Sequence, residues 1–494
     1  MTHPEKEATG LAPRDLSLII GGAMIAIFLA ALDQTIVATA LPWIARDLGD
    51  VALLSWVVTS YLVTSICATA IAGKLSDIHG RRPLMLAALV VFVVASVACA
   101  LAESMAALIA ARAAKGIGGG ALVTLAQTVV ADVVSPRERG RYSAHFSAMW
   151  ALASLLGPTV GGALTQYLGW QWIFWINLPL GLVALATVDS VLRKLPQRSV
   201  PARIDAPSLL LLPVATTALL LALSWGGVAH PWASTPVLLA LVLALAAGAA
   251  FWRRQGRLEE PVFPPAFLRD DVVARVLPAI FLAFGAYLSL AITMPVFMQV
   301  KLGLQPGDVG LMMIPLTFST TITAYASGRY LRRTGDYRRP VLVGFPLAAL
   351  SSLAFAAVVP DAGPWTVVIA LLCIGFGIGP IFPTAIVAIQ NAVEPRDVGA
   401  VTGALGYARA LGGAVCAAAA TALVLALAPQ GGDLRGLDDL VRAPLGEAGR
   451  AAVASAFRWL LVAVGLLVLA GWASYARVAA RPLRGQSVLA GTRR

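Results

Sequence analysis

Four charged side chains lie inside stretches that are otherwise apolar. Asp33 is in the first such stretch, Arg112 and Lys115 are in the fourth, and Arg409 is in the thirteenth. A charge deep in a lipid bilayer costs several kcal/mol, on the order of 3 or more, so each is a candidate functional residue. A carboxyl group held between burial, which favours its neutral form, and a cation, which favours its charged form, can bind and release a proton. The chemistry indicated is proton and charge handling within a membrane.

The spacing of the two basic residues in the fourth stretch suggests their partner. If this stretch runs antiparallel to the first, Arg112 lies near the depth of Asp33, which is then its nearest candidate partner. A permanent structural ion pair is the alternative to a role in proton movement. Lys115 lies one helical turn from Arg112 on the same face. It either extends to the membrane surface or adds a second cation to a cavity, where it would disfavour cationic substrates, and Arg409 would add a third.

Composition indicates the elements that hold these residues. The chain has 494 residues, of which 59% are hydrophobic and 13% charged, and its mean hydropathy is +0.82. Soluble domains carry about 25% charged residues. Charges and turn residues bound fourteen apolar stretches, each long enough to cross a bilayer core about 30 Å thick as a helix. We therefore expect an all-α integral membrane protein with fourteen transmembrane helices.

Several other classes of protein are not expected. The sequence has no phosphate-binding loop of the P-loop type and no His-Glu-x-x-His pattern, so no enzyme activity, cofactor or metal is predicted. The formal net charge of +12 comes from basic residues interspersed between apolar stretches, which favours membrane topology signals over nucleic-acid binding. Four cysteines lie in apolar stretches and are predicted to pack in the core: Cys67, Cys99, Cys373 and Cys416.

The basic residues also predict an orientation. Most of the 37 Lys and Arg residues fall in every second loop, on the side of the predicted tails 1–16 and 480–494. Cytoplasmic loops of membrane proteins carry this excess of basic residues. We therefore expect a multi-pass protein of the cell (inner or plasma) membrane with both termini in the cytoplasm.

An internal repeat divides the chain. The stretch Gly73–Pro83 after the second span is matched by Gly328–Pro340 after the tenth, with two glycines at the same offset. We therefore predict two six-helix halves, 17–191 and 274–479, and an inserted helix pair with linkers in 192–273. Parallel repeats of this kind suit a protein that moves one half against the other around a site between them.

Ordered motifs along the chain resemble those of a known family. They are Leu32–Pro42, Gly73–Pro83, Arg112–Gly118, Gly157–Gly162, Trp170–Pro179, Met294–Gln299 and Arg409–Gly413. In this order the chain resembles the major facilitator superfamily, and in particular its fourteen-helix drug:proton antiporter branch. The resemblance implies proton-driven export of small amphipathic compounds, no cofactor, and proton coupling by Asp33 and Arg112.

The resemblance also implies two mechanical elements. A conformational latch would be formed by Gly73, Asp77, Gly80, Arg81 and Arg82, although the basic residues could instead only set topology. An antiporter hinge would be formed by Gly157, Pro158, Gly161 and Gly162, with ordinary helix packing as the alternative.

The function expected is proton-coupled efflux of neutral or weakly charged amphipathic compounds, with about one proton per turnover because Asp33 is the clear acid inside a span. A dedicated exporter of one metabolite, lipid or antibiotic is the alternative, and a membrane sensor without transport is a third. The expected partners are the substrate, protons, membrane lipid and, in a Gram-negative host, a periplasmic adaptor. Polar residues within the spans are candidates for the cavity: Gln34, Thr35, Lys115, Gln127, Tyr287, Gln299, Gln390 and Arg409.

Overall fold

The computed structural model describes residues 13–50, 53–193, 205–227, 230–428, 437–442 and 446–483. Within these ranges the regular structure is helical, and no β-strand is formed. The predicted tails fall largely outside the described residues, as does most of the linker that opens the inserted segment. The helices are α1 (Pro13–Leu48), α2 (Leu54–His79), α3 (Arg81–Ala100), α4 (Met105–Val133), α5 (Pro136–Tyr167), α6 (Trp172–Trp175), α7 (Asn177–Leu192), α8 (Ala206–Trp225), α9 (Thr235–Gln255), α10 (Asp271–Leu302), α11 (Pro306–Thr334), α12 (Arg339–Val358), α13 (Pro364–Ile378), α14 (Ile381–Ala392), α15 (Val398–Leu427), α16 (Leu437–Arg442) and α17 (Glu447–Ala476).

In the described part of the chain, fourteen helical segments are long and apolar enough to cross a membrane. The pair α6 and α7 makes one of these segments, and the pair α13 and α14 makes another, whereas α16 is too short. The prediction of an all-helical membrane protein with fourteen spans is confirmed.

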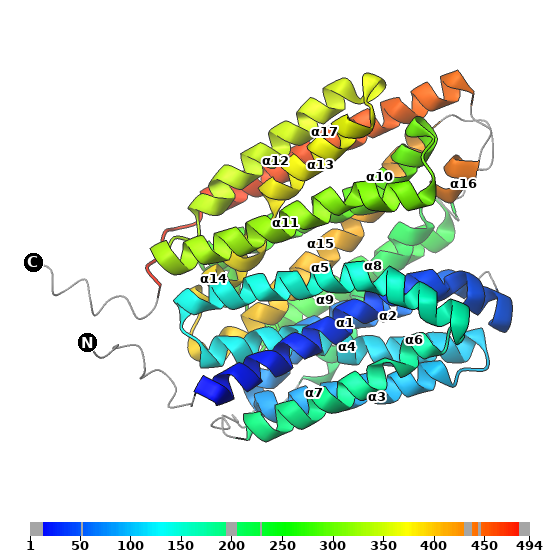
Figure 1. Ribbon diagram of the computed structural model, residues 1–494. Coiled ribbons are helices and arrows are strands. Elements are labelled where there is room, and N and C mark those ends of the chain that lie inside the picture. Colours follow the sequence, from blue (N-terminus) through cyan, green and yellow to red (C-terminus); the bar gives the residue numbers. More distant parts are fainter. Residues whose placement is uncertain are drawn as a thin grey trace, which may run out of the picture.

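Helix packing follows one pattern twice. Helix α1 packs on α5 and α7, and α10 packs in the same way on α15 and α17. Likewise α4 lies against α2 and α3, and α13 lies against α11 and α12. Figure 1 shows most of α1–α7 in the lower part of the view and α10–α13 with α17 in the upper part. This arrangement agrees with two related halves, and their residue limits stay a prediction.

The turn that follows the second helix of each half repeats a backbone detail. Gly80 ends α2 with φ of 89°, and Gly335 ends α11 with φ of 74°. Positive φ values are readily adopted by glycine and strained for other residues. The sequence repeat therefore coincides with a positive φ at both glycines, although ψ differs, at 158° for Gly80 and 4° for Gly335.

The two halves meet along α2 with α15 and along α5 with α11, and the latter two lie side by side in Figure 1. Helices α8 and α9 pack on each other, and α8 also packs against α2 and α15. The hydroxyls of Thr216 and Tyr407 lie 2.8 Å apart, and Lys74 of α2 is ion-paired with Glu260 beyond α9. The inserted pair is thus tied to both halves.

Helix α1 begins and α17 ends at the same end of the bundle (Figure 1), which we call the tail end. Exposed residues mark the two ends: Arg257 follows α9 at the tail end, and Glu103 follows α3 at the far end.

We predict that the tail end is cytoplasmic, because it carries the excess of basic residues. In a variant without the native cysteines, a membrane-impermeant maleimide should label Glu103→Cys in intact cells and Arg257→Cys only after permeabilisation. The reverse pattern would contradict the predicted orientation.

Candidate functional site

Asp33 lies in the middle of α1 and is fully buried. One carboxylate oxygen accepts a hydrogen bond from Nη1 of Arg112 at 2.5 Å, and the other accepts one from Nζ of Lys115, also at 2.5 Å. Both cations come from α4. A fully buried carboxylate is therefore held between two cations from one neighbouring helix.

Arg112 is fixed by more than its ion pair. Its Nε donates to the backbone carbonyl of Val57 in α2 at 3.0 Å, and its guanidinium carbon lies 4.3 Å from the centre of the Tyr61 ring. The side chain is 1% exposed. Hydrogen bonds and a cation–π contact thus orient the group that faces Asp33.

Lys115 binds the same carboxylate as Arg112. It is completely buried and does not extend to the membrane surface in this conformation, and its place in the cavity stays a prediction. Its Nζ also donates to Ser96 at 2.8 Å and lies 4.8 Å from the Phe92 ring centre. Since Arg112 and Lys115 share one helix face, they reach the same carboxylate, and this spacing was the signal that pointed to it.

The buried cluster carries one negative and two positive charges. In a low-dielectric interior these interactions are strong, and removing one partner of a buried pair typically costs about 3–5 kcal/mol. Each oxygen of Asp33 accepts a hydrogen bond from a cation in this conformation, and the cations favour the charged form of the carboxyl group.

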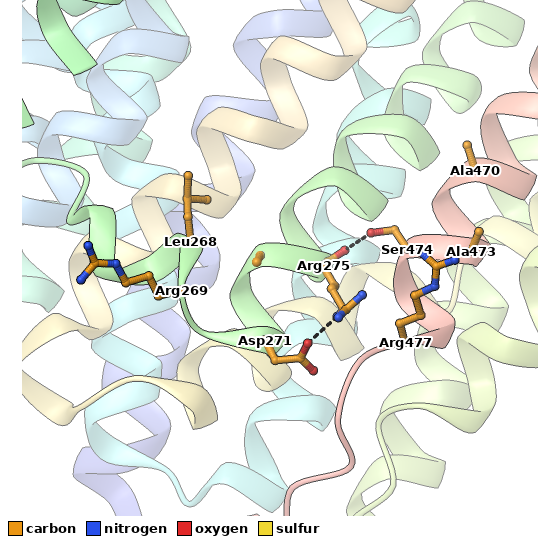
Figure 2. A pocket seen from close by; sticks show the side chains of 9 residues that line it. Leu268, Arg269, Asp271, Arg275, Ala470, Ala473, Ser474 and Arg477 are labelled. Atoms are coloured by element: carbon orange, nitrogen blue, oxygen red, sulfur yellow. Dashed lines mark hydrogen bonds and ion pairs between the residues drawn. The ribbon is translucent and has the colours of Figure 1, made fainter. Parts of the chain in front are cut away.

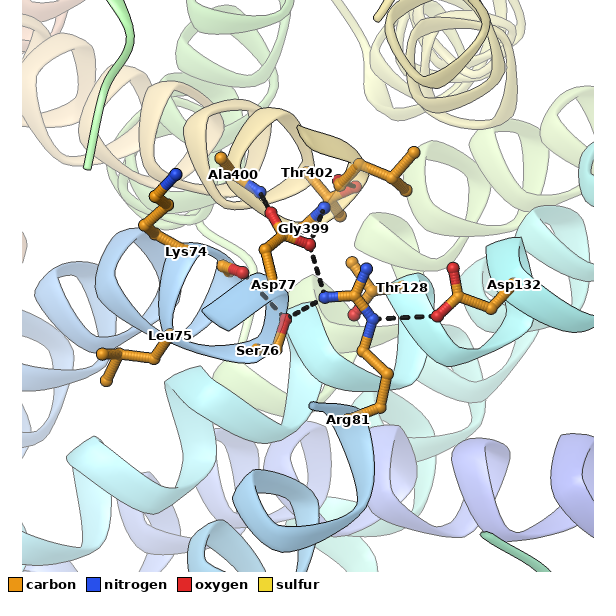
Figure 3. A network of polar contacts seen from close by, with 12 residues as sticks. Lys74, Leu75, Ser76, Asp77, Arg81, Thr128, Asp132, Gly399, Ala400 and Thr402 are labelled. Atoms are coloured by element: carbon orange, nitrogen blue, oxygen red, sulfur yellow. Dashed lines mark hydrogen bonds and ion pairs between the residues drawn. The ribbon is translucent and has the colours of Figure 1, made fainter. Parts of the chain in front are cut away.

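A second polar network lies at the tail end, where α2 meets α15 (Figure 3). Asp77 accepts hydrogen bonds from the backbone amides of Gly399 at 3.0 Å and Ala400 at 2.7 Å. These amides lie in the first turn of α15, where the helix dipole favours negative charge. Arg81 donates to Asp77 at 2.6 Å and to Asp132 at 2.9 Å. One carboxylate therefore joins the two halves directly.

The other predicted latch residues make different contacts from those of Asp77 and Arg81. Gly73 and Gly399 approach so closely that a Cβ on either would overlap the other's backbone. Arg82 pairs with Asp189 at 2.6 Å, an interaction within the first half. The sequence analysis did not find Asp132, Asp189 and the α15 amides, because all of these partners come from distant segments and the amides have no side-chain signature.

The four predicted hinge residues lie in α5, and two of them contact α1. A Cβ on Gly157 would overlap Thr35, and one on Gly161 would overlap Ile36 and Thr39, whereas Gly162 has open space around it. Pro158 is exposed and lies inside the helix.

The predicted cavity residues fall into two groups. Thr35 hydrogen-bonds the carbonyl of Ala153 at 2.9 Å, Gln390 is buried against Thr402, and Gln299 bonds within its own helix. These three have structural contacts. The others are half-buried, as Thr35 and Gln299 also are, and remain predicted cavity residues: Gln34, Gln127, Arg409 and Tyr287, whose hydroxyl lies 3.4 Å from that of Thr317.

Two open cavities lie away from Asp33. Figure 2 shows one of about 600 Å³ between the start of α10 and the end of α17, where Arg275 pairs with Asp271 at 2.5 Å. The other, of about 170 Å³, is lined by Arg141, Tyr325, Arg329 and Arg332. Neither contains a residue predicted for the cavity, and Arg332 occupies the position that corresponds to Asp77 in the repeat.

A helical membrane bundle with a buried charge cluster and a polar contact between its halves is typical of a secondary transporter. The family model of the Major Facilitator Superfamily matches residues 23–417. The chain belongs to this superfamily and is a membrane transporter, not an enzyme.

Several relatives of this chain are named as multidrug transporters or efflux pumps. The chain is 32% identical over 398 residues to "Multidrug transporter protein MdtP" of Bacillus subtilis (strain 168), covering 80% of this chain and 73% of the relative. It is 35% identical over 392 residues to "MFS-type efflux pump LUC4" of Fusarium sp, covering 78% of this chain and 70% of that protein. It is also 32% identical over 418 residues to "Efflux pump FUS6" of Gibberella moniliformis (strain M3125 / FGSC 7600), covering 83% and 74%.

Solved structures show the same fold. A bacterial homologue of the iron transporter ferroportin in an outward-facing state has a TM-score of 0.64 at 12% identity and covers 95% of this chain and 100% of that chain. The human organic anion transporter MFSD10 (TETRAN) has a TM-score of 0.61 at 18% identity and covers 93% and 100%.

We predict that Asp77→Asn loosens the contact between α2 and α15. Each charge-assisted hydrogen bond contributes about 1.5–3 kcal/mol, so the closed tail end should lose on the order of tenfold in relative population. A thiol introduced by Thr69→Cys, in a background without native cysteines, lies in this interface. Its rate of maleimide labelling in purified protein should rise several-fold.

Asp189→Asn is the matched control, because it removes a tail-end carboxylate whose partner Arg82 lies in the same half. Equal labelling rates in the Asp77→Asn variant and the parent protein would show that Asp77 is not a latch.

Proposed function

We propose that this protein exports small amphipathic compounds in exchange for protons, with Asp33 as the coupling acid. The observation that carries the proposal is the fully buried carboxylate with both oxygens on cations. The efflux names of the relatives support the export direction.

The proton step follows from the geometry. In the described conformation, Asp33 is ionised and sealed by Arg112 and Lys115. A proton that reaches Asp33 neutralises it and weakens its attraction to both cations. Helices α1 and α4 can then move apart, and release of the proton on the other side draws them together again. One carboxylate in the cluster corresponds to one proton per cycle.

The tail-end network holds one of the two conformations of the cycle, the one in which the tail end is closed. We infer that the tail end faces the cytoplasm and is closed here by Asp77 on α15. Substrate then leaves from the far end, and the cycle continues when this contact breaks. Because the second repeat has Arg332 in the matching position, the contact between α5 and α11 lacks an equivalent carboxylate. Opening is therefore controlled mainly from the α2 side.

The proton role of Asp33 is tested by energised efflux of the neutral dye Nile red from cells that express the protein. We expect wild-type efflux to fall when a protonophore is added, and Asp33→Asn to match that lower level without the protonophore. Asp47→Asn should pump like wild type, because Asp47 is an exposed residue at the end of the same helix, bonded to Trp170.

The Asp33→Asn variant leaves two buried cations without their carboxylate and could therefore fail to fold. The double variant Asp33→Asn with Lys115→Met removes one charge of each sign, so the net charge of the cluster stays as in wild type. Efflux at the wild-type rate by either properly expressed variant would contradict the proposed coupling role.

A further inference from the structure

Arg409 is a cation inside the bundle that the proton cycle does not use. It lies on α15, and within the described residues no ion pair joins it to a carboxylate. Its guanidinium carbon lies 5.6 Å from the centre of the Phe284 ring in α10. Arg112 and Lys115, two fully buried cations of the first half, share Asp33. The positive charge of Arg409 is therefore available to bind an anion from outside the protein.

Arg409 is half-buried, and the residues around its aromatic neighbour indicate that it borders an internal space. Helix α14 is packed against α5, α10, α11 and α15, and its residues from Ile381 to Asn391 are buried apart from Phe382. The half-buried Phe382 therefore faces an opening inside the bundle. Its ring centre lies 6.0 Å from that of Phe284, and the two rings meet edge to face. Arg409 and its aromatic neighbour thus border this opening.

The same opening has an aromatic wall. Phe284 and Tyr287 stack with centres 5.9 Å apart and an angle of 22° between the planes. The hydroxyl of Tyr287 lies 3.4 Å from that of Thr317 in α11. Four helices of the second half therefore contribute one cation, two hydroxyls and three aromatic rings, all of which are half-buried. Binding sites of this type have apolar walls with a few polar groups that orient the ligand.

The chemistry of this wall selects a class of ligand. A guanidinium binds carboxylates and sulfonates through paired N–H groups, and its charge is costly in a membrane interior unless an anion is near. Aromatic rings bind a flat apolar body by stacking. We propose that Arg409 binds the anionic group of the transported compound, whose aromatic body lies against Phe284, Tyr287 and Phe382. This inference rests on the proposed efflux function and makes amphipathic aromatic anions the preferred substrates, with neutral compounds bound less tightly.

Two fluorescent probes differ in the relevant group. 1-Anilinonaphthalene-8-sulfonate is an anion, and N-phenyl-1-naphthylamine is its neutral counterpart without the sulfonate. Binding of both is measured with purified protein in nanodiscs of neutral lipid. We expect wild type to bind the sulfonate more tightly, and Arg409→Met to weaken sulfonate binding about tenfold while amine binding changes less than twofold.

Arg409→Lys should retain part of the preference, since it keeps the charge without the paired donors. Arg477→Gln is the control for a lost positive charge, because Arg477 is exposed at the pocket in Figure 2, away from the wall. Retained amine binding shows that each variant is folded. The proposal is overturned if wild type does not prefer the sulfonate, or if Arg409→Met weakens both probes equally.

Transport is read separately. Wild type that binds the sulfonate through Arg409 but shows no protonophore-sensitive efflux of either probe would leave the anion site standing and contradict the proposed efflux function. If wild type exports the amine in a protonophore-sensitive way but Arg409→Met leaves binding of the sulfonate unchanged, the efflux function is supported and the anion site is contradicted.

Discussion

The structure depends on how a carboxylate is kept charged inside a membrane protein. Asp33 is tolerated in α1 because two cations from α4 occupy its oxygens, and those cations are tolerated because Asp33 is there. Their positions require α4 to lie close to α2, whose Val57 carbonyl accepts from Arg112. The cluster is therefore both a packing constraint on three helices and the place where one added proton changes the balance of charge.

A change at this cluster can reach the interface between the halves along α2. Helix α2 binds Arg112 through the Val57 carbonyl near one end. Near its other end it carries Asp77, which accepts hydrogen bonds from the first turn of α15. Helix α15 in turn carries Arg409. The proposed proton site, the predicted latch and the proposed anion site thus lie on a short series of packed helices, which suits rigid movement of one half against the other.

Much of the fold could be predicted, because a membrane imposes a fixed length and apolar character on each span. Depth along two antiparallel helices was enough to expect Asp33 near Arg112, and the two form an ion pair. The position of Lys115 was left open between the membrane surface and the cavity, although its spacing from Arg112 pointed to the same acid. The partners of Asp77 could not be inferred, since backbone amides of α15 have no sequence signature. The aromatic wall at Arg409 could not be predicted either, because its rings come from segments that are distant in the sequence.

The most direct test of the account is the number of protons exchanged when purified protein binds a transported compound. A pH indicator in weakly buffered solution should report about one proton released per molecule of wild type. It should report none for Asp33→Asn, with compound binding retained. Proton release that is unchanged in the Asp33→Asn variant would show that the exchanged proton resides elsewhere and would contradict the central role of the Asp33 cluster.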